Sequence, residues 1–213
     1  MAYAAAVDAD DLGGSAVLGP VHEVTLARQA TLVAMRVVAG SLGGRRINAG
    51  DSENLRPTAD RVREAMFNSL YSLGAIADSV VLDLFAGSGA LGIEALSRGA
   101  ARAVFVESDR LALAVLRENL ESLGLADRAT VLPADATEFL PRAGRYDLLL
   151  LDPPYSFDRW PELLGEAADS VVAIESDREV ELPESWETHR VRRYGGTVVT
   201  LATAPAASEN HVS

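Results

Sequence analysis

A buried strand that runs straight into a glycine-rich turn constrains the fold of this chain more than any other feature. Residues 80–84 are apolar apart from one aspartate, as expected of a strand buried on both faces of a parallel sheet. Gly87 and Gly89 then provide a tight turn, and a helix follows. Residues 87–92 fit the G-x-G-x-x-G pattern of dinucleotide-binding folds, and acidic Glu107 lies twenty residues beyond Gly87.

The rest of the chain alternates between strand and helix patterns. Strands are predicted near residues 80–84, 103–107, 129–132, 146–151, 171–175, 188–193 and 197–202. Helices are predicted near residues 90–98, 110–123, 136–141 and 159–168. This alternation predicts an α/β, Rossmann-like fold with a seven-stranded, mostly parallel sheet and helices on both faces. The turn at residues 194–197 makes the last strand antiparallel, and residues 35–48 predict an N-terminal β-hairpin extension.

A carboxylate at the end of the first sheet strand argues against a pyrophosphate in the glycine turn. Asp83 lies four residues before Gly87, and at 4 Å it would repel a phosphate by about 4 kcal/mol at an effective dielectric constant of 20. A zwitterionic amino acid has the opposite need, because its ammonium group favours a carboxylate and its own carboxylate favours amides. The methionine half of S-adenosylmethionine is such a zwitterion and fits both of these requirements. Glu107 could then bind the ribose hydroxyls, and Asp135 the adenine amino group.

The motif Asp152-Pro153-Pro154-Tyr155 directly follows four leucines. The prolines fix φ and remove two backbone donors, so the end of this strand presents acceptors rigidly. Ligands of open α/β sheets bind at the carboxyl ends of the strands. A rigid, acceptor-rich pocket with an aromatic floor suits a flat ring that carries an exocyclic amine. With the carboxylates at three earlier strand ends, the motif predicts an S-adenosylmethionine-dependent methyltransferase.

The predicted site has two parts. The catalytic residues are Asp152, Pro153, Pro154 and Tyr155. The cofactor-binding residues are Asp83, Phe85, Ala86, Gly87, Ser88, Gly89, Glu107, Ser108, Asp135, Ala136 and Thr58.

Several stretches resemble a known family. They are residues 36–46, 55–70, 81–100, 151–155 and 194–201. In these stretches the chain resembles the D-type family of bacterial small-subunit ribosomal RNA guanine-N2 methyltransferases, which have the class I methyltransferase fold. The resemblance covers about residues 35–203, and its most family-specific part is the helix start at Arg56-Pro57-Thr58. It implies methylation of one guanine of small-subunit rRNA, either as free RNA or within an assembled subunit.

Three other functions remain open from the sequence. An adenine-N6 or protein-glutamine methyltransferase would share the chemistry, but such enzymes use Asn-Pro-Pro-Tyr, and position 152 is aspartate. An NAD-binding oxidoreductase would explain the glycine pattern and Glu107 but leaves Asp83 and residues 152–155 unexplained. A catalytically silent rRNA-binding assembly factor with the same fold is the third.

The charge distribution predicts where RNA would bind. A net charge of −12 argues against a general nucleic-acid binder. Between residues 26 and 65, however, seven arginines stand against four acids, so this segment carries +3 and the rest −15. We therefore expect local contacts between RNA phosphates and four arginines of this segment. They are Arg36, Arg45, Arg46 and Arg63.

Composition excludes several other kinds of site. The chain has no cysteine and no lysine, which excludes disulfides, thiol nucleophiles and lysine Schiff bases. Its three histidines are far apart in sequence, so no metal site is predicted. No apolar stretch approaches the length of a membrane span, and residues 1–34 lack the pattern of a signal peptide. We expect a soluble, cytoplasmic protein without a membrane partner.

The predicted organisation has four parts. Residues 1–34 form a loosely ordered extension, 35–55 a hairpin arm that contacts RNA, 56–203 the methyltransferase domain, and 204–213 a C-terminal tail.

Overall fold

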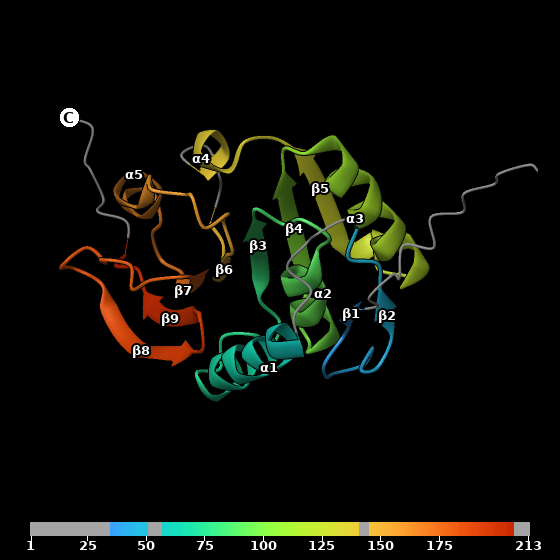
Figure 1. Ribbon diagram of the computed structural model, residues 1–213, viewed down its shortest axis with the longest axis horizontal. Coiled ribbons are helices and arrows are strands. Elements are labelled where there is room, and N and C mark those ends of the chain that lie inside the picture. The colour runs from blue at the N-terminus through green and yellow to red at the C-terminus, as the bar shows by residue number, and fades with distance from the viewer. Residues whose placement is uncertain (1–34, 51–56, 141–144, 207–213) are drawn as a thin grey trace, which may run out of the picture. The chain divides into compact units, whose positions relative to one another are not determined.

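The computed structural model describes residues 35–50, 57–140 and 145–206 (Figure 1). Contacts divide the chain into residues 1–31 and residues 32–213, and every described residue belongs to the second unit. The predicted N-terminal extension and most of the predicted tail therefore lie outside the described residues. No helix of the described part is long and apolar enough to cross a membrane.

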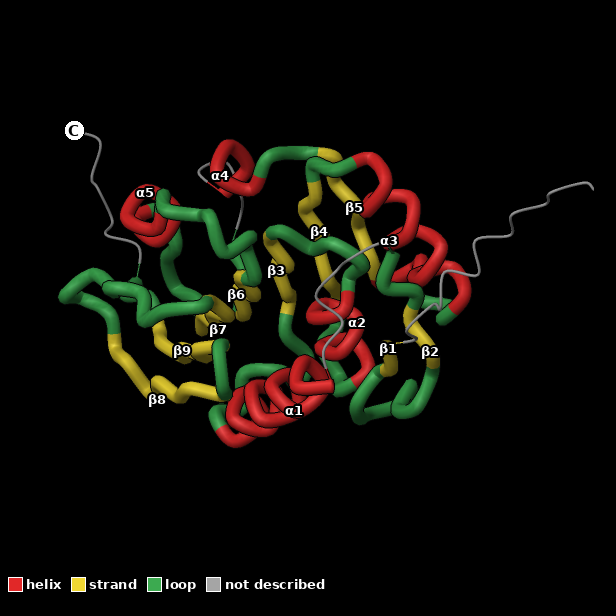
Figure 2. Tube along the Cα trace, in the orientation of Figure 1, coloured by secondary structure: helices red, strands yellow, loops and turns green. Residues whose placement is uncertain are grey.

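A seven-stranded sheet with the strand order β5-β4-β3-β6-β7-β9-β8 forms the centre of this unit (Figure 2). The strands are β3 (Val80–Leu84), β4 (Arg102–Glu107), β5 (Ala129–Pro133), β6 (Leu148–Leu151), β7 (Val171–Ser176), β8 (Glu187–Tyr194) and β9 (Thr197–Thr203). Only β9 runs antiparallel to its neighbours. The predicted fold is confirmed, including the antiparallel last strand, and each strand begins and ends within two residues of its predicted bounds.

The parallel pairing brings four strand ends to one edge of the sheet. Strand β3 lies between β4 and β6, and β7 lies beside β6. Leu84 pairs with both Val106 and Leu151, and Leu151 also pairs with Ile174. The residues that follow these positions therefore meet at the carboxyl edge, where ligands of open α/β sheets bind.

Helices cover both faces of the sheet, as predicted, and each face has its own apolar core. One core contains buried side chains of α1 (Pro57–Ser72), α2 (Ala90–Ser97) and α3 (Arg110–Ser122). The other contains side chains of α4 (Ala136–Phe139) and α5 (Trp160–Gly165). A 3-10 turn, η1 (Ala126–Arg128), leads into β5. Residues of the central strands alternate between the two cores because successive side chains of a strand point to opposite faces.

Helix α1 begins at Pro57, which the first turn of a helix tolerates because its missing N–H has no intrahelical partner there. The buried face of α1 includes Val62, Met66 and Leu70. The side chains of Phe67 and Arg63 are buried as well.

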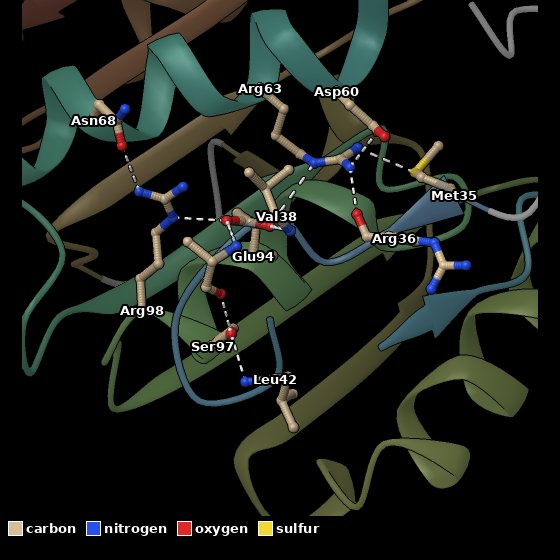
Figure 3. Close-up of polar contacts among 12 residues, drawn as sticks. Met35, Arg36, Val38, Leu42, Asp60, Arg63, Asn68, Glu94, Ser97 and Arg98 are labelled. Atoms are coloured by element: carbon tan, nitrogen blue, oxygen red, sulfur yellow. Dashed lines mark hydrogen bonds and ion pairs between the residues drawn. The ribbon is translucent and has the colours of Figure 1, made fainter. Parts of the chain in front are cut away.

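The predicted hairpin is present as β1 (Met35–Arg36) and β2 (Arg46–Ile47), paired antiparallel. The carboxylate of Glu94 in α2 holds the turn after β1: it accepts from the N–H groups of Val38 (2.7 Å) and Ala39 (3.1 Å) (Figure 3). Ser97, one turn further along α2, accepts from the N–H of Leu42 at 3.0 Å. The hairpin is thus docked on α2 through side chains that satisfy its backbone.

Two arginines surround the same buried carboxylate. Arg98 donates to Glu94 at 2.6 Å, and the guanidinium of Arg63 lies 3.9 Å from it (Figure 3). Arg63 also donates to Asp60 at 2.8 Å and to the carbonyl of Arg36 at 2.7 Å. It is only 3% exposed, so the phosphate contact predicted for Arg63 does not fit its position. The positive charge of Arg63 neutralises an interior carboxylate instead of meeting RNA.

We expect Glu94→Gln to lower the free energy of unfolding by about 3–5 kcal/mol, because it leaves two buried arginines without their shared counter-charge. Urea denaturation followed by circular dichroism measures this change. Glu118→Gln, at an exposed position of α3, is the matched control. Equal stabilities of the two variants would contradict the importance assigned to this carboxylate.

Candidate active site

Three of the four carboxylates predicted at strand ends lie near one another at the carboxyl edge. Asp83 belongs to β3, Glu107 ends β4, and Asp152 follows β6. Burial raises the pKa of Asp83 well above its usual value, the N–H of Gly92 opposes this rise, and the charges of Asp152 and Glu107 add to it. Asp83 is thus a fully buried acid with acidic neighbours.

The Asp83 side chain is fixed by the first turn of α2. The N–H of Gly92 donates to its Oδ2 at 2.8 Å. A Cβ at Gly92 would lie 2.3 Å from the ring of Phe105 and 3.0 Å from the same Asp83 oxygen, so only glycine fits here. No described residue donates to the other oxygen, Oδ1. A buried carboxylate without a counter-charge among the described residues suits a cationic ligand group, as expected for the ammonium of S-adenosylmethionine.

The glycine turn is strained at its first residue. Phe85 has a φ of 64°, which is unfavourable for a residue with a side chain and is typical of functional sites. Ala86 is buried, and its N–H donates to the carbonyl of Val106 at 3.0 Å. Gly89, with a φ of 85°, precedes α2. The carbonyl of Ser88, inside the turn, accepts from the side chain of a residue in α3 at 2.9 Å.

Glu107 joins the glycine turn to the end of β4. Its Oε2 accepts from the N–H of Gly87 at 2.8 Å, and its Oε1 accepts from the N–H groups of Ser108 and Asp109, each at 2.7 Å. A carboxylate offers about four acceptor positions, so capacity remains for a ligand hydroxyl. This geometry fits the ribose contact predicted for Glu107.

Asp135 lies at the N-terminus of α4 and is exposed. Its Oδ1 accepts from the N–H groups of Thr137 (2.8 Å) and Glu138 (3.3 Å) and from the Thr137 hydroxyl. The Thr137 hydroxyl contributes most to lowering the pKa of Asp135, so this group stays ionised at neutral pH. Its Oδ2 accepts from no described residue and fits the predicted adenine contact. Ala136 beside it is buried.

One predicted cofactor residue, Thr58, falls in the first turn of α1, where the structure does not describe side chains.

The motif at residues 152–155 follows β6 directly. Asp152 and Pro154 are exposed, Pro153 is buried, and Tyr155 is 44% exposed. Although Asp152 is accessible to solvent, surrounding protein atoms partly desolvate its carboxylate, and this burial raises its pKa to about 6. A shallow hollow adjoins the motif, lined by residues 153–155 and by side chains of the chain segment after β7.

Two sets of contacts hold this motif in place. The guanidinium of Arg178 donates to the carbonyls of Tyr155 (3.2 Å) and Phe157 (2.7 Å). The ring of Phe157 packs edge-on against Phe85 (5.2 Å between centroids) and Trp160 (5.0 Å). Because Phe85 belongs to the glycine turn, these rings couple the two parts of the predicted site.

The three remaining arginines of the predicted RNA arm are exposed on the hairpin. Arg36 donates to the carbonyl of Gly44 at 3.0 Å, and Arg45 donates to the carbonyl of Ser122 at 3.1 Å. No described residue accepts from the guanidinium of Arg46. Their guanidinium groups keep free donors at the surface, unlike that of Arg63.

Sequence reasoning missed three residues of this region. Asn119 of α3 donates to the carbonyls of Ser88 and Asn48 and so ties the glycine turn to the hairpin. Arg178 holds the residues after Pro154. Glu175, near the end of β7, interacts with Asp152. Only Glu175 had a detectable signal, because it is an acid at the carboxyl end of a predicted strand.

Among the described residues, no group of three or more histidine, aspartate or glutamate side chains has the geometry of a metal site.

The strand order, the glycine turn and the carboxyl-edge site together define a class I methyltransferase fold. A methyltransferase solved in complex with SAH has the same fold, with a TM-score of 0.58 at 13% identity over 70% of this chain and 50% of that one. The methyltransferase yhhF of Escherichia coli is more similar, with a TM-score of 0.72 and 36% identity over 82% of this chain and 99% of that chain.

Sequence comparison identifies the family. The family described as conserved hypothetical protein 95 matches residues 35–203. Ribosomal RNA small subunit methyltransferase D of Escherichia coli K12 is 37% identical over 83% of this chain and 93% of its own length. Its counterpart in Haemophilus influenzae is 35% identical over 71% and 84%. The chain belongs to this D-type methyltransferase family, as the resemblance of its motifs indicated.

We expect the raised pKa of Asp152 to cost stability at neutral pH. Its ordinary pKa is about 3.9, so between that value and about 6 the folded protein holds the proton more tightly than the unfolded chain. The stability that this proton contributes to the folded protein is present at low pH and is lost as the pH rises through 6. Asp152→Asn, which cannot ionise, should therefore melt higher than wild type at pH 8, by a larger margin than at pH 5.

Thermal unfolding at the two pH values measures this difference. Asp158→Asn, exposed in the same loop, is the control. A margin that does not depend on pH would contradict the desolvation of Asp152.

Proposed function

We propose that this protein transfers a methyl group from S-adenosylmethionine to the exocyclic N2 amine of one guanine in small-subunit ribosomal RNA. One observation supports this most strongly: a rigid Asp-Pro-Pro-Tyr motif follows β6 at the same edge where Asp83 of β3 and Glu107 of β4 lie. Family membership supports the class of substrate, since the named relatives are small-subunit rRNA methyltransferases.

The cofactor would bind along the ends of β3, β4 and β5. Asp83 would pair with its ammonium group, Glu107 with the ribose hydroxyls, and Asp135 with the adenine amino group. When bound there, S-adenosylmethionine supplies an electrophilic methyl group on a sulfonium. The glycine turn, with Phe85 at positive φ, brings backbone close to this ligand.

Asp152 and Pro153 would activate the acceptor amine. Guanine N2 is a poor nucleophile, because its lone pair is delocalised into the ring. If the Asp152 carboxylate and the Pro153 carbonyl each accept one N2–H, the amine moves toward tetrahedral geometry and its lone pair is directed at the methyl group. Positioning of this kind can supply about 7–11 kcal/mol. N2 would then form a bond to the methyl carbon as the bond between that carbon and the sulfonium sulfur breaks, leaving a neutral thioether, and the amine would release a proton, which Asp152 can accept.

Tyr155 would stack on the target base, a contact that contributes about 1–3 kcal/mol. Its ring is 44% exposed, so it offers a free face. The base must leave its own stack to reach this pocket. Arg178, by holding the Tyr155 carbonyl, fixes the platform before the base arrives.

We expect Asp152→Ala to lower methyl transfer by about 100-fold or more, and Tyr155→Ala to lower it by about 5- to 150-fold, the range of one stacking contact, while S-adenosylmethionine still binds. Asp152→Asn keeps an oxygen that can accept a hydrogen bond from the amine but cannot take up the released proton, so partial activity is expected. The assay follows methyl incorporation into small-subunit RNA, identifies N2-methylguanine by mass spectrometry, and measures cofactor binding by calorimetry against NAD as a second ligand.

Ser156→Ala, exposed in the same loop, is the control. A product other than N2-methylguanine, or a preference for NAD, would refute the proposed function. If the variants at positions 152 and 155 lose cofactor binding to the same extent as activity, the motif at residues 152–155 has a structural role instead.

RNA would approach over the hairpin arm. Arg36, Arg45 and Arg46 are exposed there, in a net-positive segment of an acidic chain. Each arginine changed to glutamine should weaken RNA binding and lower the slope of log affinity against log salt by about one per lost phosphate contact. Cofactor affinity should not change.

Filter binding at several salt concentrations tests this, with Arg102→Gln as the matched control because Arg102 is exposed at the opposite, amino end of β4. An unchanged salt slope in the hairpin variants would remove these arginines from the RNA interface.

A further inference from the structure

A second carboxylate lies beside Asp152 on the neighbouring strand. Strands β6 and β7 are parallel, and Leu151 pairs with Ile174. Asp152 and Glu175 are the next residues of the two chain segments, so they lie side by side at the carboxyl edge. Side chains two residues apart on a strand point to the same face of the sheet. Two residues before Asp152 and Glu175 lie Leu150 and Ala173, which pair with each other and belong to the core beneath α1 and α2. Glu175 therefore extends from the face on which Asp83 also lies.

Within the part of the chain that the structure describes, this carboxylate has no hydrogen-bond donor. Glu175 is half-buried, and no described residue donates to it or forms an ion pair with it within 4 Å. Burial raises its pKa to about 8, the charge of Asp152 contributes, and Arg63 partly opposes both. Arg63 directs its hydrogen bonds elsewhere, to Asp60 and to the carbonyl of Arg36.

A half-buried acid that no described residue pairs is costly, and such groups are concentrated at ligand sites. A carboxylate accepts hydrogen bonds and, when ionised, donates none. Its ligand should therefore offer a donor next to the group that Asp152 binds. Donors from a ligand would also favour the ionised form of Glu175 and so reverse the effect of burial on its pKa.

We propose that Glu175 accepts the N1–H of the target guanine and thereby selects guanine over bases whose N1 is an acceptor. This inference rests on the proposed function, because it takes the N2 amine as the group held by Asp152 and Pro153. In guanine, N1–H is adjacent to N2 on the same edge and points the same way. The neighbouring strands β6 and β7 thus present two acceptors to two neighbouring donors.

The same arrangement rejects adenine and its analogues. Their N1 atom carries a lone pair and no hydrogen, so above about pH 8, where Glu175 is ionised, it would face the carboxylate with no proton between them. A site built to hydrogen-bond a substrate group discriminates strongly against analogues that lack it, because its buried polar atoms remain unpaired.

The test uses RNA in which 2-aminopurine replaces the target guanine, assayed above pH 8 so that Glu175 is ionised. This base keeps the N2 amine, so it can still accept a methyl group, but its N1 is an acceptor. Wild type should methylate it with a kcat/KM lower than that for guanine by about tenfold to a hundredfold, the range of one charge-assisted hydrogen bond. Glu175→Gln offers an amide donor to N1, so we expect it to reduce this ratio by about tenfold or more.

Two further variants complete the design. Glu175→Ala should lower activity on guanine and show no gain for 2-aminopurine, because it offers neither acceptor nor donor. Glu179→Gln, exposed in the chain segment after β7, should behave as wild type. Cofactor affinity and melting temperature, measured in parallel, separate a change of base selection from a general structural defect.

The outcomes distinguish this inference from the proposed function. If wild type does not form N2-methylguanine, the proposed function fails and the role of Glu175 fails with it. If wild type forms this product and Glu175→Gln leaves the ratio between the two bases unchanged, only the role of Glu175 is overturned.

Discussion

The buried carboxylate of Glu94 is the interaction on which the arrangement of this protein depends most. It lies on α2, directly after the glycine turn, and is completely buried. It satisfies two backbone N–H groups of the hairpin and balances two arginines. An isolated ion at that depth would be prohibitively costly, so the hairpin, α1 and α2 must assemble together around it. The helix that begins at the candidate cofactor site therefore also fixes the predicted RNA arm.

The carboxyl edge has the opposite electrostatic character. Around Glu94 the chain supplies a counter-charge and donors, whereas Asp83, Asp152 and Glu175 face one another or solvent with few donors of their own. Burial raises the pKa of each. A fold selected for stability alone would pair these acids, as it does at Glu94. Leaving them without an ion-pair partner among the described residues lowers stability and preserves acceptors for the ammonium group and base donors of the proposed ligands.

Most of the fold could be predicted from sequence because its signals are local. Apolar runs, the glycine turn and the turn at residues 194–197 each determine a strand or its direction without knowledge of distant contacts. The role of Arg63 could not be predicted, because it depends on Glu94, which lies thirty-one residues away in sequence and reaches it only after α1 packs on α2. A charge count treats a buried arginine and an exposed one alike. Asn119 escaped prediction for the same reason, since its partners lie in two distant loops.

Arg63 also links the two electrostatic environments. Its guanidinium donates hydrogen bonds to Asp60 and to the Arg36 carbonyl of the hairpin, and it forms an ion pair with Glu94. Its positive charge also lowers the pKa of Glu175. Any movement of the hairpin that shifts Arg63 would therefore change how readily Glu175 ionises. RNA bound on the exposed arginines of the hairpin, as proposed, would contact the same segment whose Arg36 carbonyl holds Arg63. The proposed RNA arm and the proposed base pocket would thus be connected through one buried side chain.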